Sequence, residues 1–254
     1  MRGLSAGLIL LLSLAKTAYG CAEPPWSQTD LTESIATQNG TTAWYSGATR
    51  EYGHGVLGDL AEGKTLHLWS TQSSQPCGVQ HTLDASHVFE DITPRIMDLD
   101  GDDVPELITI RAHQRKGAQI AIYRAKGNSL NLIATTDYIG TRYRWLAPAG
   151  IADFDGDGAI DIAFVDRPHL AKTLRLFRFE NDQLTEWRQV RGVTNHKIGW
   201  PYIAGGLRDC GQGPEIVLAD ARWQRVLSLS WPNAQLASKD LGPYTGPDSL
   251  TKPC

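Results

Sequence analysis

Two short stretches of the chain concentrate carboxylates at a spacing that suits a metal ion. Both follow the pattern D-x-D-x-D-x-x-x-D/E, which places carboxylates at positions one, three, five and nine. A hard cation such as Ca²⁺ takes about six to eight oxygen ligands, and a tight loop with alternating carboxylates can wrap it. The sequence therefore predicts two calcium sites. The predicted ligands are Asp98, Asp100, Asp102, the Val104 carbonyl and Glu106 in the first loop, and Asp153, Asp155, Asp157, the Ala159 carbonyl and Asp161 in the second.

Two other interpretations, an EF-hand and a plain solvated turn, fit these loops less well. An EF-hand needs Glu at position twelve and flanking helices, but position twelve is Thr109 in one loop and Phe164 in the other. Strand-like apolar runs, not helices, follow both loops. Plain solvated turns also use Asp and Gly, but two near-identical copies argue against that simpler interpretation.

The acidic loops belong to a longer repeat. Their first aspartates, Asp98 and Asp153, are 55 residues apart, and decayed copies occur near Leu57 and Leu207. After each copy comes a short apolar run, then a turn and an alternating stretch. A period near 50 residues with about four strands per repeat is typical of β-propeller blades. We therefore expect an all-β protein, a β-propeller with four recognisable blades anchored near residues 57, 98, 153 and 207, with a fifth blade possible. The decayed copies retain too few carboxylates to hold a metal well.

On these residues the chain resembles the FG-GAP/VCBS repeat family, whose calcium-loop blades also occur in integrin alpha-subunit propellers. The resemblance covers roughly residues 50–230, and the two DxDGD loops are its specific part. The letters FG-GAP are barely visible, with APAG at residues 147–150 a weak echo. The family implies a propeller whose calcium loops join the first and second strands of two blades. It does not imply one function, because such propellers serve adhesion, carbohydrate binding and enzyme scaffolding.

A second surface follows from this topology. If the calcium loops lie on one face, the connections between blades emerge on the other, and these segments are rich in basic and aromatic residues. Such a surface suits an anionic or sugar-like ligand. The alternative is structural, since Arg and Trp in such loops often bridge neighbouring blades. The predicted ligand-binding residues are Arg142, Arg144, Trp145, His169, Asn195, His196 and Lys197.

The N-terminus has the pattern of a secretory signal peptide. Arg2 precedes an apolar run at residues 4–15, and the small residues Ala18 and Gly20 precede Cys21. The run is too short for a bilayer core of about 30 Å. We predict a signal peptide at residues 1–20, a single propeller domain at residues 21–254 without a transmembrane span, and a secreted or periplasmic location. A lipoprotein anchored at Cys21 is the alternative, although its processing signal usually has Leu where Ala18 stands.

Cysteine usage and charge fit this export. The four cysteines, at positions 21, 77, 210 and 254, show no CxxC spacing, which favours disulfides over a zinc site. Their pairing stays open. With 24 basic and 28 acidic residues and a net charge of −4, the chain is not a nucleic-acid binder of the usual basic kind.

Enzyme signatures are weak. No GxSxG, HExxH, Walker or Rossmann motif occurs, so no catalytic residue is assigned. The sequence favours an exported binding or adhesion module for an extracellular protein or glycan. One alternative is a propeller enzyme, a hydrolase or lyase acting on an extracellular polymer, with His169, Asn195 and His196 as the candidates. The other is a structural subunit of an envelope assembly.

Overall fold

The computed structural model describes residues 29–58, 60–70, 78–251 and 254. The predicted signal peptide, Cys21 and Cys77 lie outside this part of the chain. Within it, the only helices are three short 3₁₀ turns, at Thr32–Ser34, Pro232–Ala234 and Pro247–Leu250. None of the described helices is long and apolar enough to span a membrane. The predicted all-β class is confirmed.

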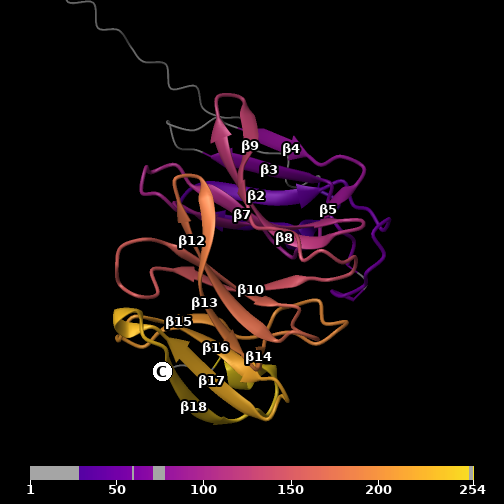
Figure 1. Cartoon of the computed structure of the whole chain (residues 1–254). Helices are drawn as coiled ribbons and strands as arrows, with labels where there is room; N and C mark the ends of the chain where they lie inside the picture. Colours follow the sequence, from indigo (N-terminus) through magenta and orange to yellow (C-terminus); the bar gives the residue numbers. More distant parts are fainter. Residues whose placement is uncertain (1–28, 59, 71–77, 252–253) are drawn as a thin grey trace, which may run out of the picture.

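Four antiparallel sheets follow one another along the chain (Figure 1). In Figure 1 they run from the indigo first sheet at the top to the yellow fourth sheet at the bottom. The first sheet contains β1 (Ala36–Gln38), β2 (Thr41–Ser46), β3 (Thr65–Ser70) and β4 (Val79–Thr82). The second contains β5 (His87–Phe89), β6 (Arg95–Met97), β7 (Glu106–His113), β8 (Gly117–Lys126) and β9 (Ser129–Thr135). The third contains β10 (Leu146–Ala152), β11 (Asp161–Asp166), β12 (Thr173–Glu180) and β13 (Gln183–Arg191). The fourth contains β14 (Val193–Thr194), β15 (Gly206–Asp209), β16 (Pro214–Asp220), β17 (Arg225–Ser230) and β18 (Ala237–Pro243).

The edge strand that opens each sheet differs between sheets. In the third sheet, β10 is continuous apart from a register shift between Pro148 and Gly150. In the second sheet, β5 and β6 both pair with β7, and in the fourth β14 and β15 both pair with β16. The segments 90–94 and 195–205 interrupt these two edge strands. Neither segment pairs as a strand with β7 or β16.

Two of the middle strands, β11 and β8, are buried on both faces along most of their length. Every residue of β11 is buried, and so are seven consecutive residues of β8, beginning at Gly117. Such continuous apolar runs are what a strand covered on both faces requires. One hydrophobic cluster joins the second, third and fourth sheets to Tyr52, Val56 and Leu57 of the loop between β2 and β3. That loop therefore takes part in the core that joins the sheets.

A cavity of about 620 Å³ lies where the first strands of the four sheets approach one another. Its lining includes Thr37 of β1, Arg95 of β6, Ala149 of β10 and Gly206 of β15. Most of the other lining residues are apolar. The opening strands thus surround a common space, as expected for sheets arranged around an axis.

The decayed repeat near residue 57 has a different place from the other copies. The first acidic loop, residues 98–105, connects β6 to β7, and the second, residues 153–160, connects β10 to β11. Each therefore joins the first and second strands of its sheet. In the first sheet that connection is the two-residue turn Asn39–Gly40, both at positive φ, whereas Leu57 lies between β2 and β3. The likeness at Leu57 reflects a turn followed by an apolar run, and not the same position in a sheet.

Candidate functional site

The two acidic loops (residues 98–106 and 153–161) have the same conformation. The Asp98 carboxylate accepts backbone N–H groups from Gly101 at 2.8 Å, Asp102 at 3.2 Å and Asp103 at 3.0 Å. The Asp153 carboxylate accepts the equivalent N–H groups at 2.8, 3.2 and 2.9 Å. Gly101 makes the sharp turn at a φ of +76°, where L side chains are strained. In both loops the first aspartate thus organises the backbone that carries the other carboxylates.

Each loop gathers three carboxylates tightly enough to hold one ion. Among the described residues, single carboxylate oxygens of Asp98, Asp100 and Glu106 lie within 4.8 Å of one another. The same is true of three in the second loop, Asp153, Asp155 and Asp157. Of the predicted ligands, Asp102 and Asp161 stand outside these trios. The backbone N–H groups of Val104 and Ala159 donate to Asp102 and Asp157.

The carboxylates at position nine, Glu106 and Asp161, are fully buried. Burial raises the pKa of Glu106, and it raises the pKa of Asp161 to about 6. A desolvated carboxylate gains most from a nearby positive charge. The donor set of clustered carboxylate oxygens is the one that hard divalent cations prefer, so these residues fit calcium.

Two arginines that sequence reasoning missed reach into the acidic loops. Arg178 of β12 pairs with Asp161 across the strands and donates from Nε to Asp161 Oδ1 at 3.0 Å. It also contacts Asp155 at 3.2 Å. In the second sheet Arg124 of β8 donates from Nε to Glu106 at 2.6 Å. The sequence does carry a signal for these contacts: in both repeats an arginine follows the position-nine carboxylate at nearly the same spacing, 17 or 18 residues.

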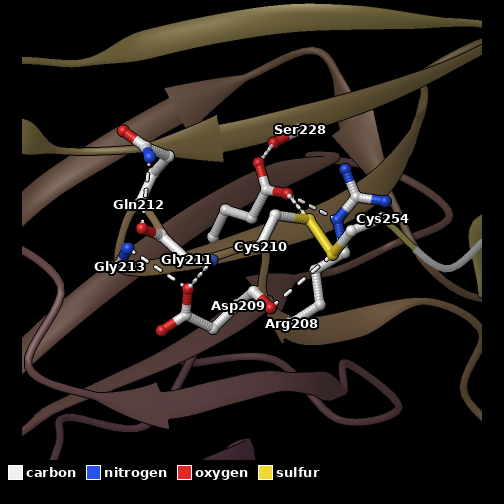
Figure 2. The surroundings of a disulfide bond; sticks show 9 residues. Arg208, Asp209, Cys210, Gly211, Gln212, Gly213, Ser228 and Cys254 are labelled. Carbon is white, nitrogen blue, oxygen red and sulfur yellow. Dashed lines mark hydrogen bonds and ion pairs between the residues drawn. A yellow bond between two sulfur atoms is a disulfide. The ribbon is translucent and has the colours of Figure 1, made fainter.

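The decayed loop between β15 and β16 is fastened by a disulfide (Figure 2). Asp209 Oδ1 accepts N–H groups from Gly211 at 2.7 Å and Gly213 at 3.2 Å, so a tight turn is retained. Cys210 is bonded to Cys254. The predicted disulfide chemistry is confirmed for these two cysteines. No metal-ligand trio occurs in this loop within the described part of the chain.

The other ends of the strands form what we call the opposite face, built from loops 47–64, 90–94, 136–145, 167–172, 195–205 and 221–224. The predicted ligand residues all lie there, at different depths. Arg142 is exposed, whereas Arg144, His169 and Lys197 are half-buried. Trp145, Asn195 and His196 are only 2%, 0% and 0% exposed. These three buried side chains can support the face but offer a ligand almost no surface.

Histidines and aromatic rings meet at the centre of this face. His169 Nε2 and His196 Nδ1 are 3.0 Å apart, and the ring of Trp145 lies edge-on to His196 with centroids 4.9 Å apart. Burial, followed by the nearby His196, lowers the pKa of His169 to about 4. Asn195 turns away and donates to Pro148 O at 3.0 Å. The structure thus brings His169, His196 and Trp145 together and places Asn195 in a supporting contact.

A buried acid and a histidine lie beside this cluster, and their pairing could not be predicted from the sequence. Glu90 is 2% exposed, and its Oε1 contacts His54 Nδ1. Glu90 Oε2 has no hydrogen-bond partner among the described residues. Burial raises the pKa of Glu90 to about 7. Because the two residues come from different loops, 36 positions apart, no spacing rule could have paired them.

The fold and these loops define an all-β repeat protein with acidic connections between first and second strands. Residues 98–164, which contain both acidic loops, match the family model of the FG-GAP-like repeat. The resemblance drawn from the sequence to the FG-GAP repeat is therefore confirmed for this segment.

Two solved structures that match this chain are distant from it. A hypothetical selenium-binding protein from Sulfolobus tokodaii matches with a TM-score of 0.45 and 10% identity, over 80% of this chain and 53% of that one. A putative 6-phosphogluconolactonase from Bacteroides fragilis matches with a TM-score of 0.42 and 11% identity, over 84% and 56%. The chain spans about half the length of these structures. We draw no functional conclusion from them. No curated protein matches the sequence.

Proposed function

We propose that this chain is an exported, calcium-binding β-propeller of four blades that serves as a binding or adhesion module. The observation that carries the proposal is the repeated acidic loop: two copies with the same hydrogen bonds and a buried carboxylate at position nine. The FG-GAP-like repeat and the four consecutive antiparallel sheets support the propeller. The Cys210–Cys254 disulfide is consistent with an extracellular or periplasmic location.

In this proposal each acidic loop holds one calcium ion. Side chains at positions one, three and five would supply ligands, together with the Val104 or Ala159 carbonyl and the residue at position nine. A bound calcium ion supplies two positive charges and a link between the first and second strands. Arg124 and Arg178 supply one further positive charge each, close to the buried carboxylates.

The proposed ligand surface is the opposite face, and its ligand is anionic or a carbohydrate. Among the predicted ligand residues, the accessible cations are Arg142, Arg144 and Lys197, and His169 is half-buried. Trp145, Asn195 and His196 would hold these loops in position. The Arg142 guanidinium lies 4.2 Å over the Tyr143 ring, and Arg144 donates to Tyr143 O at 2.8 Å. Both arginines are thereby anchored, and no carboxylate among the described residues pairs with them, which leaves their charge available to an anion.

One observation favours a second candidate, a propeller enzyme acting on an extracellular polymer. The Glu90 carboxyl, with its unpartnered oxygen and raised pKa, lies against His54 at the same face. General acid–base catalysis uses such perturbed groups. Loss of polymer cleavage in Glu90→Gln would favour this candidate, whereas absence of any turnover in the wild-type protein would favour the binding module.

The calcium proposal is tested by thermal unfolding with EDTA and with added Ca²⁺. At 100 times its Kd, a ligand that binds only the folded state stabilises it by about 2.7 kcal/mol per site, or roughly 5–10 °C per site for a chain of this size. We expect this rise for the wild type and a much smaller one for the double variant Asp100→Asn, Asp155→Asn. Asp240→Asn, a change at an exposed carboxylate that pairs with Arg225 on the fourth sheet and touches neither loop, serves as the control. A melting temperature that ignores both EDTA and calcium would contradict the proposal.

A further inference from the structure

Four aromatic side chains gather at the part of the opposite face formed by the fourth sheet. Trp200 and Tyr202 come from loop 195–205, Trp223 from the turn between β16 and β17, and Tyr244 from the segment after β18. Trp223 lies edge-on to Trp200 and Tyr244, with centroids 5.4 and 5.0 Å apart, and Trp200 stacks on Tyr202 at 4.8 Å. All four are partly exposed, Tyr202 by 40%. We call this group the aromatic cup.

The Lys197 ammonium lies in the cup. Its nitrogen is 4.7 Å from the centroid of Trp223 and 5.3 Å from those of Trp200 and Tyr244. Within the described part of the chain it makes no ion pair and no hydrogen bond. By contrast, Lys64 and Lys172 donate to backbone carbonyls at 2.6 and 2.7 Å. Lys197 thus holds a half-exposed positive charge among ring faces, with its N–H donors available.

Trp223 occupies a turn position whose backbone conformation would suit glycine better than tryptophan. Trp223 has a φ of +57°, in the left-handed region that a bulky L residue rarely adopts. Asp220 holds the turn, because its Oδ1 accepts N–H groups from Gln224 at 2.6 Å and Arg225 at 2.8 Å. Glycine would make the same turn without strain. Strained residues of this kind cluster at ligand sites, and here the strained residue supplies the ring at the centre of the cup.

Packing accounts for only part of this arrangement. Trp200, Trp223 and Tyr244 cover Val217, Val226 and Leu250 at the edge of the fourth sheet. That contact explains aromatic residues at this place. It does not explain a lysine without an acidic partner in their midst or a tryptophan at positive φ.

We propose that the aromatic cup binds an acidic sugar, a uronic-acid unit of an extracellular polysaccharide. This inference rests on the proposed ligand role of the opposite face. The sugar carboxylate would pair with Lys197 and with Arg222, the exposed residue next to Trp223 in the same turn. The C–H face of the sugar ring would lie on an aromatic ring, whose negative face attracts electropositive C–H groups. The acidic glycan therefore matches both the charge and the flat apolar surfaces of the cup.

The test is titration of the full chain with a galacturonic acid trimer, followed by tryptophan fluorescence and calorimetry. We expect saturable binding that is lost when the trimer carboxylates are methyl-esterified. Lys197→Met should weaken binding at least tenfold. Lys116→Met is the matched control, since the Lys116 ammonium lies 5.2 Å over a single ring, Tyr138, on another sheet, and it should leave the affinity unchanged.

Trp223→Gly separates binding from packing. Glycine relieves the positive φ, so we expect an unchanged or higher melting temperature together with at least tenfold weaker binding. A lower melting temperature with unchanged affinity would overturn the inference and assign the cup to packing. Equal binding of the esterified trimer, or binding of choline in place of the acidic trimer, would overturn it as well.

Failure of this inference can be told apart from failure of the proposed function. If the trimer does not bind while calcium still raises the melting temperature, the acidic-sugar inference is wrong and the calcium propeller stands. If the trimer binds and the affinity is lost only in Arg142→Ala, Arg144→Ala, the ligand face stands but its centre is not the cup.

Discussion

At the scale of single residues, burial on the opposite face favours uncharged side chains. Glu90 and His169 are both desolvated, and desolvation raises the pKa of an acid and lowers that of a base. The pKa of Glu90 is about 7 and that of His169 about 4. The two groups should therefore make opposite contributions to the pH dependence of stability.

Glu90→Gln should change how stability varies between pH 4.5 and 7. The pKa of Glu90 is about 7 in the folded chain against an ordinary value of 4.5, so the folded state binds more protons in this window. The stabilisation that Glu90 gains from this proton is complete below pH 4.5. It is lost as the pH rises through about 7, at up to about 1.4 kcal/mol per pH unit. Urea unfolding across this range should show a smaller decline in the variant.

His169→Gln should act in the other direction and provides the internal comparison. The pKa of His169 is lowered from 6.5 to about 4, so below pH 6.5 the unfolded state binds the extra proton. Stability is present above pH 6.5 and falls as the pH drops toward 4. The variant should lose this acid-side decline. Parallel pH profiles for wild type and both variants would contradict the assigned environments.

Arg178→Gln should alter the response of the chain to calcium. The guanidinium contacts Asp155 and Asp161, so its removal leaves a buried carboxylate unpaired. We expect a clear loss of stability in EDTA, and a tighter calcium affinity because the loop becomes more negative. Calorimetric titration and melting curves measure both. Arg175→Gln is the control, because Arg175 contacts Asp166 and Glu186 on the same sheet, away from the loop. Equal calcium affinity in wild type and Arg178→Gln would contradict this role.

At the scale of elements, local patterns could be predicted and long-range pairings could not. The acidic loops were found because their ligand positions fall within nine residues, so sequence spacing alone carries the signal. The all-β class followed from the same repeat. The contacts of Arg124 with Glu106 and of His54 with Glu90 could not be predicted in this way, because they form only when strands pair or loops converge. The sequence predicts the loops that carry Trp145, Asn195 and His196 but not the burial of these side chains, because burial depends on neighbouring sheets that a repeat pattern does not describe.

The disulfide fastens the decayed loop between β15 and β16, in which the described residues form no metal-ligand trio. It closes a segment with a sequence separation of 44, and the constraint it places on the unfolded chain is worth about 2–4 kcal/mol. Cys210→Ser with Cys254→Ser should lower the melting temperature by roughly 5–15 °C. The loss should be the same in calcium and in EDTA, since this loop holds no metal in our proposal. A melting temperature equal to that of the wild type would contradict the fastening role.

At the scale of the whole molecule, loops join the first sheet to the fourth. Gly199 N in loop 195–205 donates to Val56 O in loop 47–64 at 3.0 Å. Gly58 lies beside this bond at a φ of +72°. A Cβ there would come within 2.8 Å of Gly199 O, so the loops approach too closely for any side chain. This contact links the two ends of the sheet series across the opposite face.

Gly58→Ala should therefore destabilise the chain more than its backbone angle alone would. Gly127 is the matched control, because its φ is +60° and a Cβ there would have nothing within 4 Å. Gly127→Ala should cost about 1–2 kcal/mol from the left-handed conformation, whereas Gly58→Ala adds a backbone collision and should cost about 2–5 kcal/mol. Because the collision parts the two loops, amide exchange should also quicken at Gly199 in Gly58→Ala and stay unchanged in Gly127→Ala. Equal losses of stability in the two variants would mean that the sheets keep their arrangement without the contact between loops 47–64 and 195–205.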